Sequence, residues 1–126
     1  MTLSEAIEAQ KTTPKKIFID FYADWCGPCK IMDKQTYGNP IIAELINSSF
    51  YPVKFDAESK ESVTIYGKTF GNPNFEKGKK KNSLHEYTKF MNVASVPSIV
   101  FLDETSNPIT ILNGFLSPKE IEPYLS

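Results

Sequence analysis

Blocks of apolar and polar residues along the 126-residue chain predict where its helices and strands lie. Residues 16–23, KIFIDFYA, are almost continuously apolar and rich in β-branched and aromatic side chains, which is typical of a strand buried on both faces. Elsewhere, apolar residues three or four positions apart predict amphipathic helices. The predicted strands are residues 16–23, 51–57, 97–103 and 108–114, and the predicted helices are residues 4–12, 29–37, 40–46, 84–93 and 118–125.

Residues whose side chains can cap a helix stand at the predicted helix starts. Asn39 and Ser117 are each followed by a proline, which is favoured at the first position of a helix. Ser4 and Ser83 are expected to cap the helices that follow them in the same way.

The order of these elements indicates an α/β fold. A β-α-β first half followed by a β-β-α second half implies a central mixed sheet of four to five strands with helices on both faces. Residues 59–83 are the least regular part, where two short extended segments are expected to turn at Gly67. The chain contains no internal repeat and no linker, so residues 1–126 are expected to form one domain.

The charges are almost balanced, with 14 basic and 15 acidic side chains and a formal net charge of −1. This balance gives no global attraction to nucleic acid or to an anionic membrane, so neither is an expected partner. Residues 77–81, KGKKK, are the one local exception. Such a run is usually a solvated loop, and a docking surface for an acidic partner is the alternative.

No run of 18 or more apolar residues occurs, so no membrane span is predicted. The first 16 residues also lack the apolar core of a signal peptide. Two locations therefore stay open. The protein is cytoplasmic, or it is the mature form of a bacterial periplasmic or cell-envelope protein whose signal peptide has been removed.

The chain has only two cysteines, Cys26 and Cys29, and a bridge between them would close a loop too short to stabilise the fold appreciably. Three interpretations are possible: two small buried apolar residues, half of a zinc site, or a redox pair. A structural zinc site needs about four ligands, and His85 is the only histidine. We expect His85 to face solvent from its helix, whereas Phe90 and Met91 are expected in the core.

The predicted elements place Cys26 at the start of a helix, just after the first strand. Unpaired backbone N–H groups and the helix dipole favour a thiolate there. Cys29, one turn later, is expected to face Cys26 and to be more buried, which would make Cys26 an exposed attacking thiolate. Gly27 and Pro28 allow the tight entry into the helix.

Asp20 is the one charged residue inside the apolar first strand. A buried carboxyl group has a raised pKa and can act as a base near neutral pH, here toward Cys29. A polar core residue without a catalytic role is the simpler alternative. Lys54, in the neighbouring predicted strand, is the expected charge partner of Asp20.

Two motifs carry a family resemblance. FIDFYADWCGPCK resembles the active-site segment of the thioredoxin family, and SVPSIVFLD resembles that family's second signature, a cis-proline before a strand. The resemblance runs from about residue 16 to residue 125 and implies the thioredoxin fold. It implies that Cys26 is the nucleophile and Cys29 the resolving cysteine of a redox disulfide, that Asp20 is the buried acid and that Lys54 is paired with it. The implied substrate-facing residues are Trp25, Gly27, Pro28, Val96, the cis-proline Pro97 and Gly114.

The resemblance has two departures. Tyr22 stands where reductases of the family often have a second tryptophan, and residues 59–83 exceed what a minimal thioredoxin needs. That longer segment resembles an insertion in thioredoxin-like proteins of bacterial envelopes, related to the carboxyl-terminal domain of the membrane thiol-disulfide transporter. The implied partners are disulfide-containing client proteins and an upstream electron-donor thiol protein, and a monomer without a cofactor is expected.

The sequence therefore predicts a thiol-disulfide oxidoreductase that reduces protein disulfides through a mixed disulfide. A non-catalytic thioredoxin-like module that binds a partner protein is the alternative. The intact Cys-Gly-Pro-Cys motif favours the enzyme, because a binding module has no need of the cysteine pair.

Overall fold

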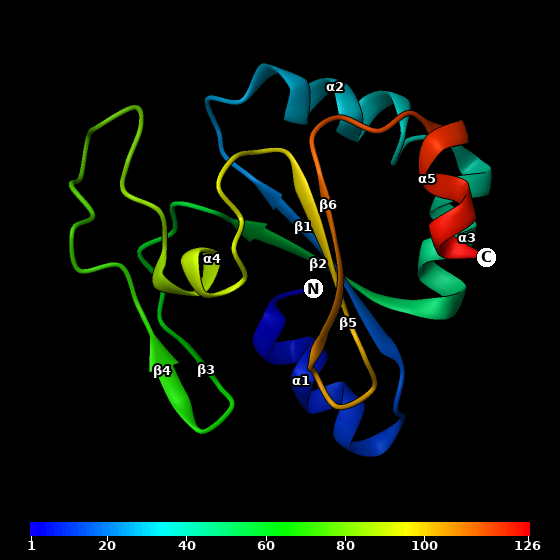
Figure 1. Cartoon of the computed structure of the whole chain (residues 1–126), viewed down its shortest axis with the longest axis horizontal. Coiled ribbons are helices and arrows are strands. Elements are labelled where there is room, and N and C mark those ends of the chain that lie inside the picture. The colour runs from blue at the N-terminus through cyan, green and yellow to red at the C-terminus, as the bar shows by residue number, and fades with distance from the viewer.

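The computed structural model describes the whole chain, Met1–Ser126, as a four-stranded mixed sheet with helices on both faces (Figure 1). The strands are β1 (Lys16–Tyr22), β2 (Phe50–Asp56), β5 (Ser98–Leu102) and β6 (Pro108–Asn113), in the order β2-β1-β5-β6. β1 pairs in parallel with β2 and antiparallel with β5, and β5 pairs antiparallel with β6. The predicted α/β class and mixed sheet are confirmed.

Five helices divide between the two faces of this sheet. They are α1 (Leu3–Thr12), α2 (Gly27–Gln35), α3 (Pro40–Ser49), α4 (Glu86–Phe90) and α5 (Pro118–Leu125). Buried side chains of α1 and α4 belong to one core cluster, and buried side chains of α2, α3 and α5 belong to a second.

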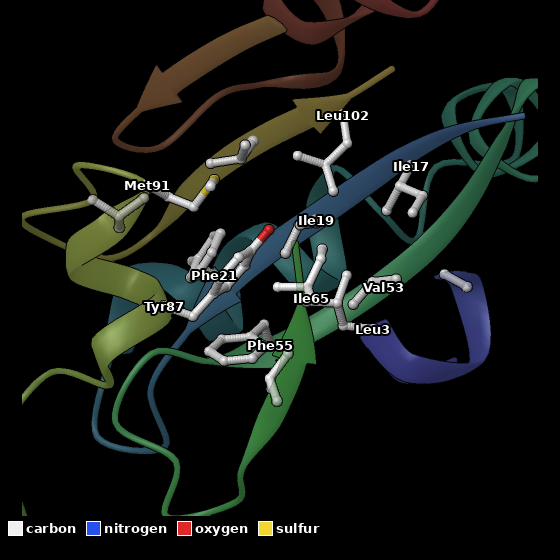
Figure 2. Close-up of a cluster of buried hydrophobic side chains, with 14 of the residues drawn as sticks. Leu3, Ile17, Ile19, Phe21, Val53, Phe55, Ile65, Tyr87, Met91 and Leu102 are labelled. Atoms are coloured by element: carbon white, nitrogen blue, oxygen red, sulfur yellow. The ribbon is translucent and has the colours of Figure 1, made fainter. Parts of the chain in front are cut away.

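β1 separates these two clusters, because successive side chains of a strand point to opposite faces. Ile17, Ile19 and Phe21 belong to the first cluster, and Phe18 belongs to the second. Figure 2 shows this first set along β1, with Phe21 beside Tyr87, which is fully buried. Asp20 points to the Phe18 side, which is the face that α2 covers. Burial on both faces of β1 is thus confirmed.

Two of the four predicted helix caps are confirmed and two are wrong. Asn39 accepts hydrogen bonds from the first turn of α3, and Ser117 forms a capping box with Glu120. Thr2, rather than Ser4, caps α1 through a capping box, because the helix already begins at Leu3.

The fourth helix also differs from its prediction. His85, rather than Ser83, caps α4, which has only five residues. Phe90 is 50% exposed, which contradicts its expected core position, because its ring packs only along one side, against the rings of Tyr66, Phe70 and Tyr87. Met91 is buried as expected.

Residues 59–83 contain a separate hairpin of β3 (Val63–Ile65) and β4 (Lys68–Phe70). Its turn is made by Tyr66 and Gly67, both at positive φ, so the predicted turn at Gly67 is confirmed. The buried residues of the hairpin are part of the first core cluster. The hairpin therefore packs on the same core as α1 and α4.

Candidate functional site

The two cysteines lie at the junction of β1 and α2, and they form a disulfide with each other. Cys26 is the N-cap of α2, and its Sγ accepts a hydrogen bond from the backbone N–H of Cys29 at 3.1 Å. Gly27 and Pro28 form the first turn, where a missing proline N–H costs no helical hydrogen bond. Cys26 therefore occupies the helix start that the sequence predicts.

The exposure of the cysteines differs from the expectation. Cys26 is 2% exposed and Cys29 is 4% exposed, so both residues are buried and Cys26 is not the more exposed of the two in this disulfide form. The bridge holds Cys26 in a small cluster with Ala23, against which Tyr22, Trp25 and Val96 pack. This disulfide is consequently covered by its neighbours.

The loop before β5 supplies a second wall of the site. The Val96–Pro97 peptide bond is cis, so the predicted cis-proline is confirmed, and Val96 packs on the cysteine cluster. The Pro97 carbonyl accepts a hydrogen bond from the backbone N–H of Gly114 at 2.9 Å. Gly114 has a φ of +88°, a conformation that favours glycine. The structure thus joins Gly114 to the cis-proline loop.

Trp25 also packs against the cysteine cluster, and it makes further contacts that the sequence does not predict. Its indole Nε1 donates to the carboxylate of Glu58, at 3.0 and 3.1 Å to the two oxygens. The ammonium of Lys81 lies 4.4 Å from the centroid of the Trp25 ring, a cation–π contact. Residues distant in sequence therefore fix the side chain next to Cys26.

Asp20 is 5% exposed within β1. Burial raises the pKa of its carboxyl group, the charge of Asp33 raises it further and the charge of Lys54 lowers it, and together these effects raise the pKa from 3.8 to about 7. A pKa near neutrality lets the group hold or release a proton at physiological pH.

Lys54 lies opposite Asp20 in the register of β1 and β2, but its ion pair is with Asp33. The Nζ–Oδ2 distance is 2.9 Å, and both side chains are about half exposed. Lys54 therefore forms no salt bridge with Asp20, but it is still a charge partner of Asp20, because its charge lowers the Asp20 pKa. Partial burial lowers the pKa of Lys54, but the hydrogen bond and charge of Asp33 outweigh this effect and raise it.

Asp33 is a site residue that the sequence reading missed. It lies four residues after Cys29 in α2, so the two residues share one helix face, and this spacing could have revealed it. Asp20, Asp33, Lys54 and Tyr37 line a surface pocket of about 450 Å³. The Tyr37 hydroxyl is buried there without a hydrogen-bond partner, and burial raises its pKa.

His85 is fully buried, which contradicts the expected solvent-facing position. Its Nδ1 accepts from the backbone N–H of Tyr87 at 3.0 Å, and its Nε2 lies 2.7 Å from the carbonyl oxygen of Glu61. Since an N–H can only donate and a carbonyl can only accept, the ring is the neutral tautomer with its proton on Nε2. His85 therefore connects α4 to the segment before β3, a structural task.

No group of three or more histidine, cysteine or acidic side chains is arranged to hold a metal ion. No helix is long and apolar enough to cross a membrane.

Comparison with curated proteins finds similarity to the thiol:disulfide interchange protein DsbD. The DsbD of Haemophilus ducreyi is 25% identical over 115 residues, and that of Vibrio vulnificus is 26% identical over 116 residues. The matched region is about nine-tenths of this chain but only 16% of each relative.

Comparison with solved structures finds the same fold. A thioredoxin from Thermus thermophilus has a TM-score of 0.69 at 16% identity, over 98% of this chain and 81% of its own. The reduced C-terminal domain of DsbD from Neisseria meningitidis has a TM-score of 0.61 at 19% identity, over 98% and 90%. A putative disulphide-isomerase from Bacteroides thetaiotaomicron has a TM-score of 0.68 at 22% identity, over 98% and 85%.

The family described as the thioredoxin-like domain matches residues 3–126, which is nearly the whole chain. The chain therefore belongs to the thioredoxin-like domain family, and its Cys26–Cys29 disulfide is a Cys-X-X-Cys pair.

Proposed function

We propose that this domain reduces disulfides of client proteins by dithiol-disulfide exchange. One observation carries the proposal: the Cys26–Cys29 disulfide begins α2 and packs against Val96 of the cis-proline loop. The start of a helix stabilises a thiolate, and the backbone of the neighbouring cis-proline loop can form hydrogen bonds with an incoming segment of the client protein.

The proposed reaction begins from the reduced domain. The Cys26 thiolate attacks one sulfur of a client disulfide, the client S–S bond breaks, and a mixed disulfide forms while a client thiolate leaves. Cys29 then loses its proton and attacks the Cys26 sulfur. The Cys26–Cys29 bond forms, the second client thiolate leaves, and two electrons have passed to the client. An upstream thiol protein returns two electrons to the domain.

Asp20 is the proposed acceptor of the Cys29 proton. Its pKa of about 7 supports this role, because a carboxylate with an ordinary pKa would be a much weaker base. Lys54 and Asp33 adjust that pKa in opposite directions. Lys54 is therefore proposed to act on the reaction through Asp20 rather than by touching the client.

Six residues are proposed to face the client. Val96 and Trp25 both pack on the cysteine cluster and Gly114 is bonded to Pro97, which supports a continuous surface around the disulfide. Gly27 and Pro28 are exposed beside it, and they present little side chain to an approaching strand. The proposed client-facing residues are Trp25, Gly27, Pro28, Val96, Pro97 and Gly114.

The domain boundaries are also a proposal. We take residues 1–126 as one thioredoxin-like domain with an insertion at about residues 59–83. The shared core cluster supports this division, because it includes residues of the β3–β4 hairpin together with residues of β1, β2 and β5.

Insulin reduction tests the proposed function. Wild-type domain with dithiothreitol as electron donor is expected to accelerate insulin reduction, and Cys26→Ser is expected to abolish the acceleration. Cys29→Ser is expected to accumulate a mixed disulfide with its client. A wild-type protein that does not accelerate the reaction would contradict the proposal and favour the binding module. A strongly oxidising equilibrium potential against glutathione would contradict the reducing direction.

A further inference from the structure

The segment of residues 59–83 carries an excess of positive charge that the rest of the chain lacks. It contains six lysines and two glutamates, which leaves eight basic and thirteen acidic residues elsewhere. The near-zero net charge of the chain is therefore the sum of a basic segment, residues 59–83, and an acidic remainder. Figure 1 shows the loop between β4 and α4, which holds most of these lysines, projecting away from the sheet at the left of the view.

We propose that the lysine loop, residues 77–81, is a docking surface for an acidic segment that flanks the reactive cysteine of a redox partner. This inference rests on the proposed function and names the chemistry of the partner.

The lysine loop is held in place rather than freely solvated. Asn82, which directly follows it, donates its backbone N–H to Glu58 Oε1 at 2.8 Å, and its own Oδ1 accepts from the backbone N–H of Glu76 at 2.7 Å. Gly78 turns the loop with a φ of +87°. Asn72 donates to the carbonyl oxygens of Glu58, Ser59 and Ser83, which ties the base of the loop together. A loop ordered in this way loses less conformational entropy when a partner binds.

The same contacts bring the loop to the redox site. Glu58 accepts from both Trp25 Nε1 and the Asn82 backbone N–H, so one carboxylate joins the tryptophan beside Cys26 to the end of the lysine loop. Lys81 lies over the Trp25 ring, and Trp25 packs on the cysteine cluster. A partner on the lysine loop would therefore have its neighbouring residues at the disulfide.

Two lysines of the loop remain free to meet that partner. Lys79 pairs with Glu76 at 3.2 Å, and Lys81 covers Trp25, but Lys77 and Lys80 form no salt bridge. Both are exposed. Because the local acids Glu58 and Glu76 already have partners, an acidic segment would meet uncompensated positive charge. Electrostatic complementarity of this kind mainly raises the association rate.

An acidic protein segment fits these observations better than an anionic membrane. Lys81 of the loop lies over Trp25, which packs on a disulfide whose chemistry requires a second sulfur, and a lipid surface offers none. Membrane binding is therefore the competing outcome of the test.

The test measures single-turnover reduction of two disulfide peptides by the reduced full chain. The peptides differ only in their flanks, four aspartates in one and four asparagines in the other. At low ionic strength the acidic peptide is expected to react about 10-fold faster, and the ratio is expected to approach one at 0.5 M salt. In Lys77→Glu/Lys80→Glu the ratio is expected to fall to one or below.

A charge-matched control separates the loop from the overall charge. Lys16→Glu/Lys119→Glu changes two exposed lysines outside the segment and is expected to keep the wild-type ratio. A wild-type ratio of one at low salt, or an equal loss of the ratio in both double variants, would overturn the inference. Loop-dependent binding to phosphatidylglycerol vesicles together with a peptide ratio of one would also overturn it, in favour of a membrane.

A failure of the proposed enzyme function can be distinguished from a failure of the proposed docking surface. If neither peptide is reduced, the proposed function fails, and the docking surface is tested with peptides whose cysteines are replaced by serine. Trp25 is the only tryptophan, so its fluorescence reports their binding. Tighter binding of the acidic peptide by wild type than by the loop variant would support the inference, and equal binding would overturn it.

Discussion

The ammonium group of Lys54 is bonded to the carboxylate of Asp33, with 2.9 Å between Nζ and Oδ2. This ion pair leaves Asp20 without the direct partner that the strand register would allow. Asp20 is therefore a buried carboxyl group close to both charges of the ion pair, the positive charge of Lys54 and the negative charge of Asp33. Burial is the main cause of its raised pKa, the charge of Asp33 adds to this effect, and the charge of Lys54 opposes it.

Asp20→Asn is expected to stabilise the oxidised protein at pH 8. The pKa of Asp20 rises from 3.8 to about 7 on folding, so the folded state binds the proton more tightly than the unfolded state. Ionisation therefore destabilises the fold increasingly from about pH 4 to pH 7, by on the order of 4 kcal/mol at the plateau. Urea unfolding should show a gain from the substitution at pH 8 that almost disappears near pH 4. An equal effect at both pH values would exclude this account of Asp20.

Asp33→Asn and Lys54→Met are expected to move the pKa of Asp20 in opposite directions. The charge of Asp33 raises that pKa and the charge of Lys54 lowers it, so Asp33→Asn should lower the value and Lys54→Met should raise it. Carbon NMR titration of the Asp20 carboxyl group measures both shifts in the disulfide form, where the cysteines do not titrate. Glu44→Gln, at an exposed position of α3, serves as the control and should leave the titration unchanged. Shifts of the same sign in both variants would contradict the arrangement.

The features that were predicted correctly from the sequence are those that depend on residues close together in the chain. The continuous apolar run of β1 and the Cys26 position at the start of α2 follow from local pattern, and both are found. The charge pairing was not predictable in the same way. The strand register places Lys54 opposite Asp20, but its ion pair is with Asp33. This choice depends on how α2 packs against the sheet, which the sequence pattern does not specify.

The segment around α4 was the least predictable for the same reason. His85 lies between Leu84 and Tyr87 in the sequence, and nothing there links it to the cysteines, so an exposed helix position was expected. Its burial depends on two backbone groups, the N–H of Tyr87 and the carbonyl of Glu61, and on the edge of the Phe55 ring. No periodic pattern records such contacts. Glu58 was missed likewise, because its link to Trp25 spans 33 positions.

His85→Ala is expected to lower the free energy of unfolding by about 2–4 kcal/mol, because it removes a helix cap and leaves a buried carbonyl and N–H without partners. The rate of insulin reduction per folded molecule should not change, since the side-chain contacts of His85 are with Glu61, Tyr87 and Phe55 and not with the cysteines. Urea unfolding and the insulin assay measure the two quantities. His85→Asn can retain the cap and should lose less stability. A variant of unchanged stability would contradict the structural role.

Glu58→Ala is expected to lower the free energy of unfolding by about 1–3 kcal/mol, because one carboxylate accepts both the Trp25 indole N–H and the Asn82 backbone N–H. Denaturant unfolding measures this loss, and Glu61→Ala is a nearby exposed control whose carboxylate has no such bonds. The preference for the acidic peptide should also decrease, since the lysine loop loses its link to the redox site. Loss of stability with an unchanged peptide preference would mean that the loop is held by its other contacts.

Gly27→Ala and Gly114→Ala separate contact with a client from strain within the fold. A methyl group at either position would meet no other atom within 4 Å, but only Gly114 has a positive φ. Gly114→Ala should therefore cost about 1–2 kcal/mol of stability through backbone strain alone. Gly27→Ala should leave stability within about 0.5 kcal/mol of wild type.

The kinetic effect of Gly27→Ala then tests directly whether a client strand passes over Gly27. Gly27 is exposed between the two cysteines, so an added methyl group would meet only an incoming strand. We expect kcat/KM for insulin reduction to fall about 10-fold, because a small displacement of the client sulfur from Cys26 misaligns the attack. Exposed Ser49, changed to Ala, is the control for assay and handling. If kcat/KM for Gly27→Ala equals that of wild type, client strands do not pass over the start of α2, and the proposed client-facing surface must exclude it.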